Sequence, residues 1–155
     1  MIESHKIVAM EILDSQQNYD RESALTIGVF DGVHAGHQKL LSQLDSIAKS
    51  KNLARVVVTF DVHPLSVIAP GHAPKMLLSL ERKLEFLEQS GLVDAVLVIK
   101  FDPVRAAQSA SDFVSEVLVD QLQVHHALVG SNFVFGHERR GNIALLKEMG
   151  LDNNF

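Results

Sequence analysis

The sequence predicts an α/β fold in which one mostly parallel sheet is covered by helices on both faces. The first observation is alternation: short apolar runs rich in β-branched residues alternate with stretches whose apolar residues recur at spacings of three and four. The second is that residues 55–60 lack polar alternation, which is typical of a strand buried on both faces. Strands that alternate with helices build right-handed βαβ units, and these units give a parallel sheet.

Five segments have the composition of strands, and turn residues follow four of them. The strands are expected at residues 6–13, 25–30, 55–60, 94–99 and about 127–130. The first run is short and suits a flanking or edge position. The other four are followed within a few residues by glycine or proline, so we expect each to end there.

Helical patterns fill the gaps between these strands. They are expected at about residues 36–50, 80–90, 104–108, 111–123 and 142–149. Ser79 and Ser111 precede two of these helices as N-cap residues. Gly91 and Gly150 follow two of them as stop signals.

The amino-acid composition limits the classes of protein to which this chain can belong. A chain of 155 residues with 46% apolar and 21% charged residues is expected to form a single globular domain with a real core. The net charge of −5 and the lack of a basic run do not favour nucleic acid as a partner. The absence of cysteine excludes disulfides and thiolate metal sites. No apolar run is long enough to span a membrane, so we expect a cytoplasmic protein with no membrane partner.

The junction between residues 25–30 and the following helix is the first candidate site. A strand that turns at Gly32 and Gly36 into a helix leaves N–H groups free at the positive end of the helix dipole, which suits an anion. His34 and His37 lie three residues apart at this junction, and both could donate hydrogen bonds to phosphate oxygens. Two histidines at a glycine turn could equally be exposed turn residues. The residues alone leave both interpretations open.

Two further polar segments follow predicted strands, at residues 61–64 and 130–141. Ligands of open α/β sheets bind beyond the carboxyl ends of the strands, so we expect all three segments to meet at one site. The Walker A sequence and the dinucleotide-binding glycine pattern are both absent from the chain.

Three segments in the same order resemble a known family. Gly28-Val-Phe-Asp-Gly-Val-His-Ala-Gly-His37 resembles the signature of the H-x-G-H nucleotidyltransferases. Its Phe-Asp-Gly-Val-His form is similar to the adenylyltransferase module of prokaryotic bifunctional riboflavin kinase/FAD synthetases. Thr59-Phe-Asp-Val-His-Pro64 and Val129-Gly-Ser-Asn-Phe-Val-Phe-Gly136 support the same resemblance. It implies a Rossmann-like parallel sheet of the nucleotidyltransferase type over residues 1–155.

The resemblance implies a reaction and a set of site residues. AMP would pass from ATP to FMN, giving FAD and pyrophosphate, with Mg²⁺ bridging the phosphates. His34 and His37 would be catalytic and would donate to phosphate without ligating a metal, so no protein metal site is expected. The residues implied in ATP binding are Gly28, Phe30, Asp31, Gly32, His34, Gly36 and His37. Those implied in FMN binding are Phe60, Asp61, His63, Pro64, Asn132 and Phe133.

Parts of the family pattern are absent from these residues. The Ile-Ser-Ser-Thr-x-Ile-Arg type segment, which helps to bind ATP phosphates in the family, does not occur, and neither does a riboflavin kinase module. We therefore expect a domain truncated at its C-terminal end, with impaired transfer, and a riboflavin kinase module in the full-length family protein. Two alternatives stay open. One is another H-x-G-H transferase of the cytidylyl or phosphopantetheine type, and the other is a non-catalytic nucleotide- or flavin-binding domain.

Overall fold

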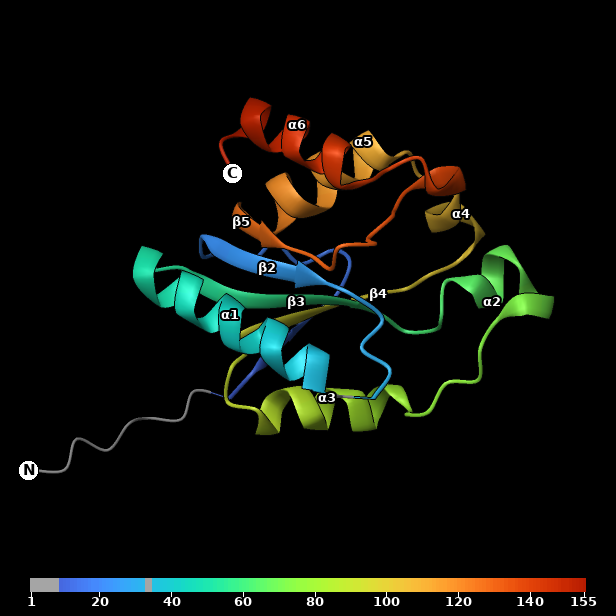
Figure 1. The fold of residues 1–155 in the computed structure, drawn as a ribbon, viewed down its shortest axis with the longest axis horizontal. Coiled ribbons are helices and arrows are strands. Elements are labelled where there is room, and N and C mark those ends of the chain that lie inside the picture. The colour runs from blue at the N-terminus through green and yellow to red at the C-terminus, as the bar shows by residue number, and fades with distance from the viewer. Residues whose placement is uncertain (1–8, 33–34) are drawn as a thin grey trace, which may run out of the picture.

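The computed structural model describes residues 9–32 and 35–155, and it confirms the predicted parallel α/β architecture (Figure 1). Five strands form one sheet in the order β1-β4-β3-β2-β5, and every neighbouring pair is parallel. The strands are β1 Glu11–Leu13, β2 Ser23–Ile27, β3 Ala54–Phe60, β4 Ala95–Ile99 and β5 Val124–Leu128. The predicted edge position of the first strand is confirmed, since β1 pairs with β4 at the end of the sheet.

Helices cover both faces of the sheet, as predicted. Figure 1 shows α1 (Ala35–Lys51) and α3 (Leu80–Gln89) on one side, with α5 (Ala110–Phe113) and α6 (Ile143–Asn153) on the other. Successive side chains of β3 point to opposite faces of the sheet and therefore pack under the helices of both sides. Val57 packs in the cluster that includes residues of α1 and α3, while its neighbours Val56 and Val58 pack in the cluster under the opposite helices.

Short helical elements complete the chain. They are α2 (Leu65–Ile68), a 3₁₀ turn η1 (Pro70–His72), α4 (Pro103–Ala106), a π-helical segment η2 (Val114–Gln121) and a 3₁₀ turn η3 (His137–Arg139). The π-helical segment directly continues α5, so the helix predicted at 111–123 is one continuous rod with two hydrogen-bond patterns.

Several boundaries differ from the sequence prediction: β5 begins three residues earlier than expected, α4 is shorter than expected, and three further differences have a clear local reason. The first central strand ends at Ile27, because the chain turns beyond it and Phe30 takes a φ of 51°. Ser109, and not Ser111, caps α5, since its side chain accepts from the Asp112 N–H. Gly150 does not stop the last helix, which continues to Asn153. The Phe155 carbonyl folds back to 2.8 Å from where a Gly150 Cβ would lie, so glycine leaves room for the tail.

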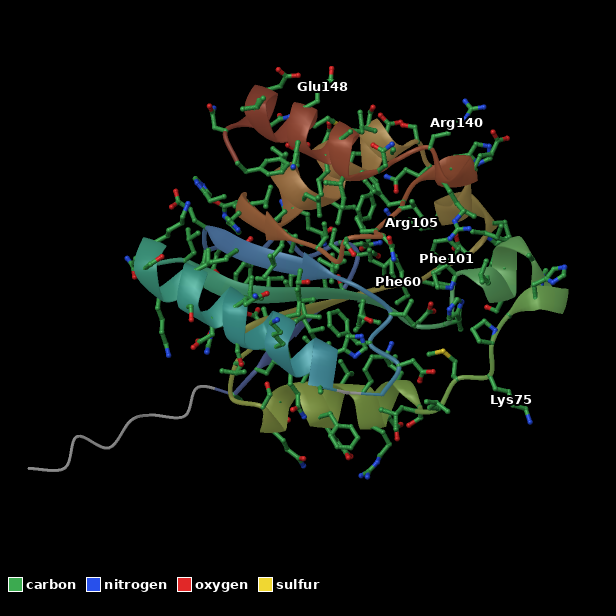
Figure 2. The ribbon with its side chains drawn as sticks, viewed as in Figure 1. Phe60, Lys75, Phe101, Arg105, Arg140 and Glu148 are labelled. Atoms are coloured by element: carbon green, nitrogen blue, oxygen red, sulfur yellow. The ribbon has the colours of Figure 1, made fainter. Side chains whose placement is uncertain are left out.

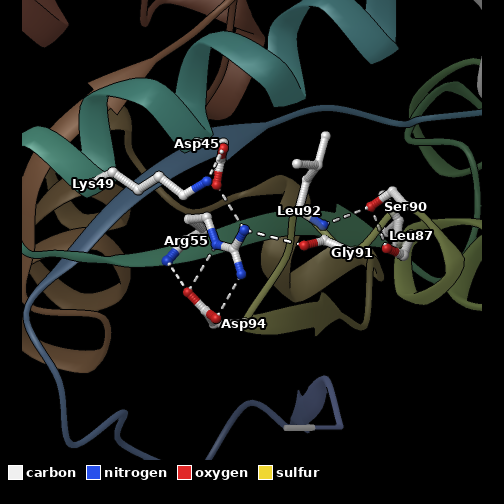
Figure 3. Close-up of polar contacts among 8 residues, drawn as sticks. All are labelled: Asp45, Lys49, Arg55, Leu87, Ser90, Gly91, Leu92 and Asp94. Carbon is white, nitrogen blue, oxygen red and sulfur yellow. Dashed lines mark hydrogen bonds and ion pairs between the residues drawn. The ribbon is translucent and has the colours of Figure 1, made fainter. Parts of the chain in front are cut away.

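A charge network clamps helix, strand and turn together (Figure 3). The guanidinium of Arg55 on β3 donates to both carboxylate oxygens of Asp94, at 3.1 and 2.9 Å, and the Arg55 backbone N–H donates to Asp94 Oδ2 at 2.7 Å. The same guanidinium reaches Asp45 on α1 at 2.7 Å and the Gly91 carbonyl at 3.1 Å. Burial raises the pKa of Asp94, but the hydrogen bonds from Arg55 outweigh it and hold that pKa below its ordinary value.

Asp94→Asn is expected to destabilise the fold by about 1–3 kcal/mol at neutral pH, because a charge-assisted two-bond contact is lost. The folded-state pKa of Asp94 is depressed. The contribution of Asp94 to the free energy of unfolding is therefore fully present above the pKa that it has in the unfolded chain. This contribution is lost as the pH falls through the lower pKa that Asp94 has in the folded protein. Urea unfolding measured at neutral pH and at successively lower pH should show this. The free energies of unfolding of the wild-type protein and of Asp94→Asn should become equal in acid. Glu85→Gln breaks an exposed pair with Arg82 and should change stability by less than about 0.5 kcal/mol. Equal losses in both variants would contradict this account.

Candidate active site

A cavity of about 330 Å³ opens at the carboxyl ends of β2 and β3. Its wall is completed by loop residues that follow β4 and β5, which are far apart in the sequence. The site therefore lies where the topology of a parallel sheet places ligands. Its volume is within the usual range of small-molecule pockets, roughly 300–1,000 Å³.

Aromatic rings form much of the cavity wall. Phe60, the last residue of β3, meets Phe101 edge to face with ring centroids 5.7 Å apart. A second pair, Phe133 and Phe135, stacks with ring centroids 5.2 Å apart and an interplanar angle of 15°. Figure 2 shows Phe60, Phe101 and Arg105 close together at this end of the sheet. Rings arranged in this way offer flat apolar surface to a flat ligand.

A few polar groups are placed around these rings. The Nδ1 atom of His63 accepts a hydrogen bond from the Leu65 N–H at 3.1 Å, so a neutral His63 carries its proton on Nε2 and is a donor there. Arg105 lines the cavity from α4 and donates to the Gln108 side chain at 2.8 Å. Asn132 and Arg139 line it from the segment after β5. An apolar cavity with a few donors suits a ligand that is flat, partly polar and anionic.

Among the described residues, Asp31 and His37 both hold the turn from β2 to α1. The carboxylate of Asp31 accepts from the N–H groups of Leu77 and Leu78 at 2.9 and 3.0 Å, which ties the turn to the loop before α3. The Nδ1 atom of His37 lies 2.8 Å from the Gly32 carbonyl oxygen, and its ring packs on Phe30 with centroids 4.9 Å apart. A carbonyl only accepts, so Nδ1 carries a proton. Nε2 can then donate to a phosphate only when the ring is a cation.

The structure brings most of the proposed flavin contacts together. Phe60, His63, Pro64, Asn132 and Phe133 all line the cavity. Asp61 does not; its Oδ1 accepts from the N–H groups of Val62 and Phe101 and so joins two loops that flank the cavity.

The proposed ATP contacts divide into three groups. Gly28 lines the cavity. Asp31, Gly32, Gly36 and His37 lie at the turn and at the first residues of α1. Phe30 is 2% exposed as a whole residue and belongs to the core, so it does not line the cavity. His34 lies outside the described residues.

Lys83 was not among the candidates from the sequence, although its charged group lies between the two halves of the site. The side chain is fully buried, and Nζ donates to the Val29 carbonyl, the Thr59 hydroxyl and the Phe60 carbonyl at 2.8, 3.2 and 3.0 Å. Burial lowers the pKa of Lys83 below its ordinary value, while Asp31 and Asp61 raise it. A lysine four residues before the buried Leu87, on the inner stripe of α3, is the sequence signal that could have indicated it.

Gly136 fixes the loop that closes the cavity beside α5. Its φ is 77°, and a Cβ at this position would lie 2.6 Å from the Ala110 Cα. Both the backbone conformation and the close approach therefore require glycine.

The described part of the chain lacks a membrane-spanning helix and a cluster of metal ligands. Within residues 9–32 and 35–155, no helix combines the length and apolar character needed to cross a membrane. Over the same ranges, no group of three or more His, Asp or Glu side chains is arranged to hold a metal ion.

A parallel sheet with helices on both faces, and an aromatic cavity beside a glycine turn at its strand ends, define a Rossmann-like domain consistent with the nucleotidyltransferase type. A crystal structure titled macrolide-efflux protein from Streptococcus pneumoniae has the same fold, with a TM-score of 0.74 and 22% sequence identity over 94% of this chain and 48% of that one. The particular family follows from sequence comparison. The FAD synthetase family model matches residues 16–155, so the chain belongs to that family.

Individual relatives agree with this assignment. A protein of Buchnera aphidicola subsp. Schizaphis graminum is 41% identical over 133 residues, which is 86% of this chain. One of Escherichia coli K12 is 42% identical over 131 residues, or 84% of this chain. Both are named bifunctional riboflavin kinase/FMN adenylyltransferase, and the match covers 42% of the length of each.

Gly136→Ala is expected to lower the free energy of unfolding by about 2–4 kcal/mol, since it combines an unfavourable positive φ with overlap on α5. Gly71→Ala is the matched control, because nothing lies within 4 Å of a Cβ there and a change under about 0.5 kcal/mol is expected. Urea unfolding of both variants makes the comparison. A Gly136→Ala protein as stable as the control would show that the loop does not pack on α5 as described.

Proposed function

We propose that this chain transfers AMP from ATP to FMN and releases FAD and pyrophosphate. The observation that carries the proposal is the meeting of an aromatic cavity with a glycine turn and helix start at one edge of the sheet. Membership of the FAD synthetase family supports it. A cytoplasmic location belongs to the same proposal. So does a companion riboflavin kinase module, supported by the bifunctional relatives.

FMN occupies the cavity in this proposal. Its flat ring system lies against Phe60 and Phe133, with the His63 Nε2–H and the Asn132 amide available to its polar edge. Arg105 and Arg139 supply positive charge for the phosphate of FMN. An acidic chain with a net charge of −5 needs such local cations to hold an anionic substrate.

ATP occupies the turn in front of α1. The N–H groups at the start of the helix and protonated His37 bind its phosphates in this proposal. His34, which lies outside the described residues, is proposed to act with them. An FMN phosphate oxygen attacks the α-phosphorus as the bond to the pyrophosphate oxygen breaks, so no covalent enzyme intermediate is required. The described residues supply no cluster of metal ligands, and Mg²⁺ is therefore proposed as part of the MgATP substrate, where it neutralises phosphate charge.

The central experiment incubates the protein with ATP, MgCl₂ and FMN and follows FAD by chromatography. FAD should form with FMN and not with riboflavin, which lacks the attacking phosphate. Binding of FMN and ATP without FAD formation would favour a non-catalytic binding domain. Turnover of CTP with a phospho-alcohol, or of ATP with phosphopantetheine, in place of FMN would favour another transferase of the same superfamily.

His37→Ala should lower the turnover number for FAD formation by about 10²-fold, since it removes a charged donor from the developing phosphate charge. His72→Ala is the matched control, because His72 is exposed and does not line the cavity. Steady-state rates of FAD formation at saturating substrate test both variants. Turnover of His37→Ala at the level of the control would remove His37 from the mechanism.

Arg105→Met should weaken FMN binding about tenfold, because one charge-assisted contact with the phosphate is lost. Riboflavin has the same ring system without the phosphate, so its affinity should be nearly unchanged. Quenching of flavin fluorescence measures both affinities. Arg140→Met is the control, since Arg140 is 76% exposed and pairs with Glu138. An equal loss for FMN and riboflavin would instead place Arg105 against the ring.

A further inference from the structure

The ammonium of Lys83 is a charge inside the fold that has no ion-pair partner among the described carboxylates. A buried charge is costly unless its hydrogen-bonding capacity is filled. Lys83 meets this condition with three oxygen acceptors, which equals the number of N–H donors on its ammonium. The three acceptors are the Val29 carbonyl, the Thr59 hydroxyl and the Phe60 carbonyl.

These acceptors lie where the ladder between β2 and β3 stops. The Gly28 N–H donates to the Val58 carbonyl at 3.0 Å, and the chain then turns away at Phe30. Beyond that bond, the Thr59 hydroxyl and the Lys83 ammonium both donate to the Val29 carbonyl, at 3.1 and 2.8 Å. Lys83 thus replaces the missing ladder and joins the two strand ends.

The joined strand ends carry the two halves of the site. Val29 lines the cavity and leads into the turn that holds Asp31 and Gly32, while Phe60 lines the cavity and leads into the segment with His63 and Pro64. The distance between the ATP turn and the flavin wall therefore depends on a contact made by a third element, α3.

We propose that Lys83 is a positioning residue for adenylyl transfer, which fixes the ATP-binding turn and the flavin wall at one spacing by binding the Val29 and Phe60 carbonyls together. The proposal rests on the function proposed above. Attack in line requires the reacting atoms to approach within about 3–3.5 Å, and a misplacement of about 1 Å can cost about 10²-fold in rate. A single ammonium at the joint can therefore control the rate without touching substrate.

The test compares Lys83→Met with Arg82→Met, which removes a positive charge from the next position of α3, where the side chain is 62% exposed. Lys83→Met should lower kcat per folded molecule by about 10–10²-fold, with KM for FMN changed much less. Arg82→Met should keep the wild-type kcat. Lys83→Arg keeps the charge and should recover part of the rate. A purely structural role would reduce the folded fraction and leave kcat per folded molecule unchanged, which would overturn the proposal.

Thr59→Val keeps the test decisive if Lys83→Met does not fold. It removes one of the three acceptors and the second donor to Val29 at nearly constant volume, so a smaller fall in kcat is expected. Thr59→Val with wild-type kcat would count against the proposal.

Amide hydrogen exchange of the substrate-free protein separates this proposal from the proposed reaction. Loss of the joint should accelerate exchange at residues 28–32 and 60–63 and leave β5 unchanged. Uniform acceleration across the sheet, or none, would overturn the role of Lys83. A wild-type protein that makes no FAD would overturn the proposed reaction, and the exchange pattern would still decide whether Lys83 joins the two strand ends.

Discussion

The architecture of the site depends on how β2 ends. Phe30 takes a left-handed backbone conformation, and the residue is 2% exposed in the core against α1 and α3. This turn releases the chain from the sheet, and it also takes the Val29 carbonyl out of the ladder. Buried carbonyls need partners, and the Val29 carbonyl accepts from two side chains, the Thr59 hydroxyl of β3 and the Lys83 ammonium of α3. The glycine turn, the start of α1 and the cavity beside them all follow from this one interruption of regular pairing.

The end of β2 separates two chemically different surfaces, an aromatic cavity and a polar turn. The cavity is lined by two ring pairs, Phe60 with Phe101 and Phe133 with Phe135, together with a few polar side chains. The turn side offers N–H groups, a helix start and a histidine whose Nδ1 proton is held by the Gly32 carbonyl. The free energy gained by apolar burial is non-directional, so it changes little with a small shift of the ligand. Hydrogen bonds to phosphate are directional and weaken when their geometry is disturbed. In the proposed reaction the phosphate contacts, which require the more exact geometry, are made by a short turn that Asp31 ties to the loop before α3.

The sheet could be predicted from the sequence because a parallel strand buried on both faces is a continuous apolar run, as in residues 55–60. The sequence also predicted that residues 61–64 and 130–141 would meet, because topology alone brings strand ends together. Other features depend on tertiary contacts that no local pattern encodes. Ser109 and Ser111 are both good caps by residue type, and packing selects Ser109. The place of Lys83 on the inner stripe of α3 hints at burial, but only the structure shows that its ammonium binds the ends of β2 and β3.

The aspartates next to the strand ends show why residue type is a weak guide to role at such a site. Asp31 and Asp61 each follow a strand that borders the cavity, yet their carboxylates accept backbone N–H groups of other loops. In the adenylyl transfer proposed for this chain, the enzyme abstracts no proton and forms no covalent bond, so its rate depends on alignment and on charge placed in advance. Residues that hold loops then act on the rate through geometry. Asp31, Asp61 and Lys83 belong to one such framework, and the substrates would meet it only through the loops it fixes.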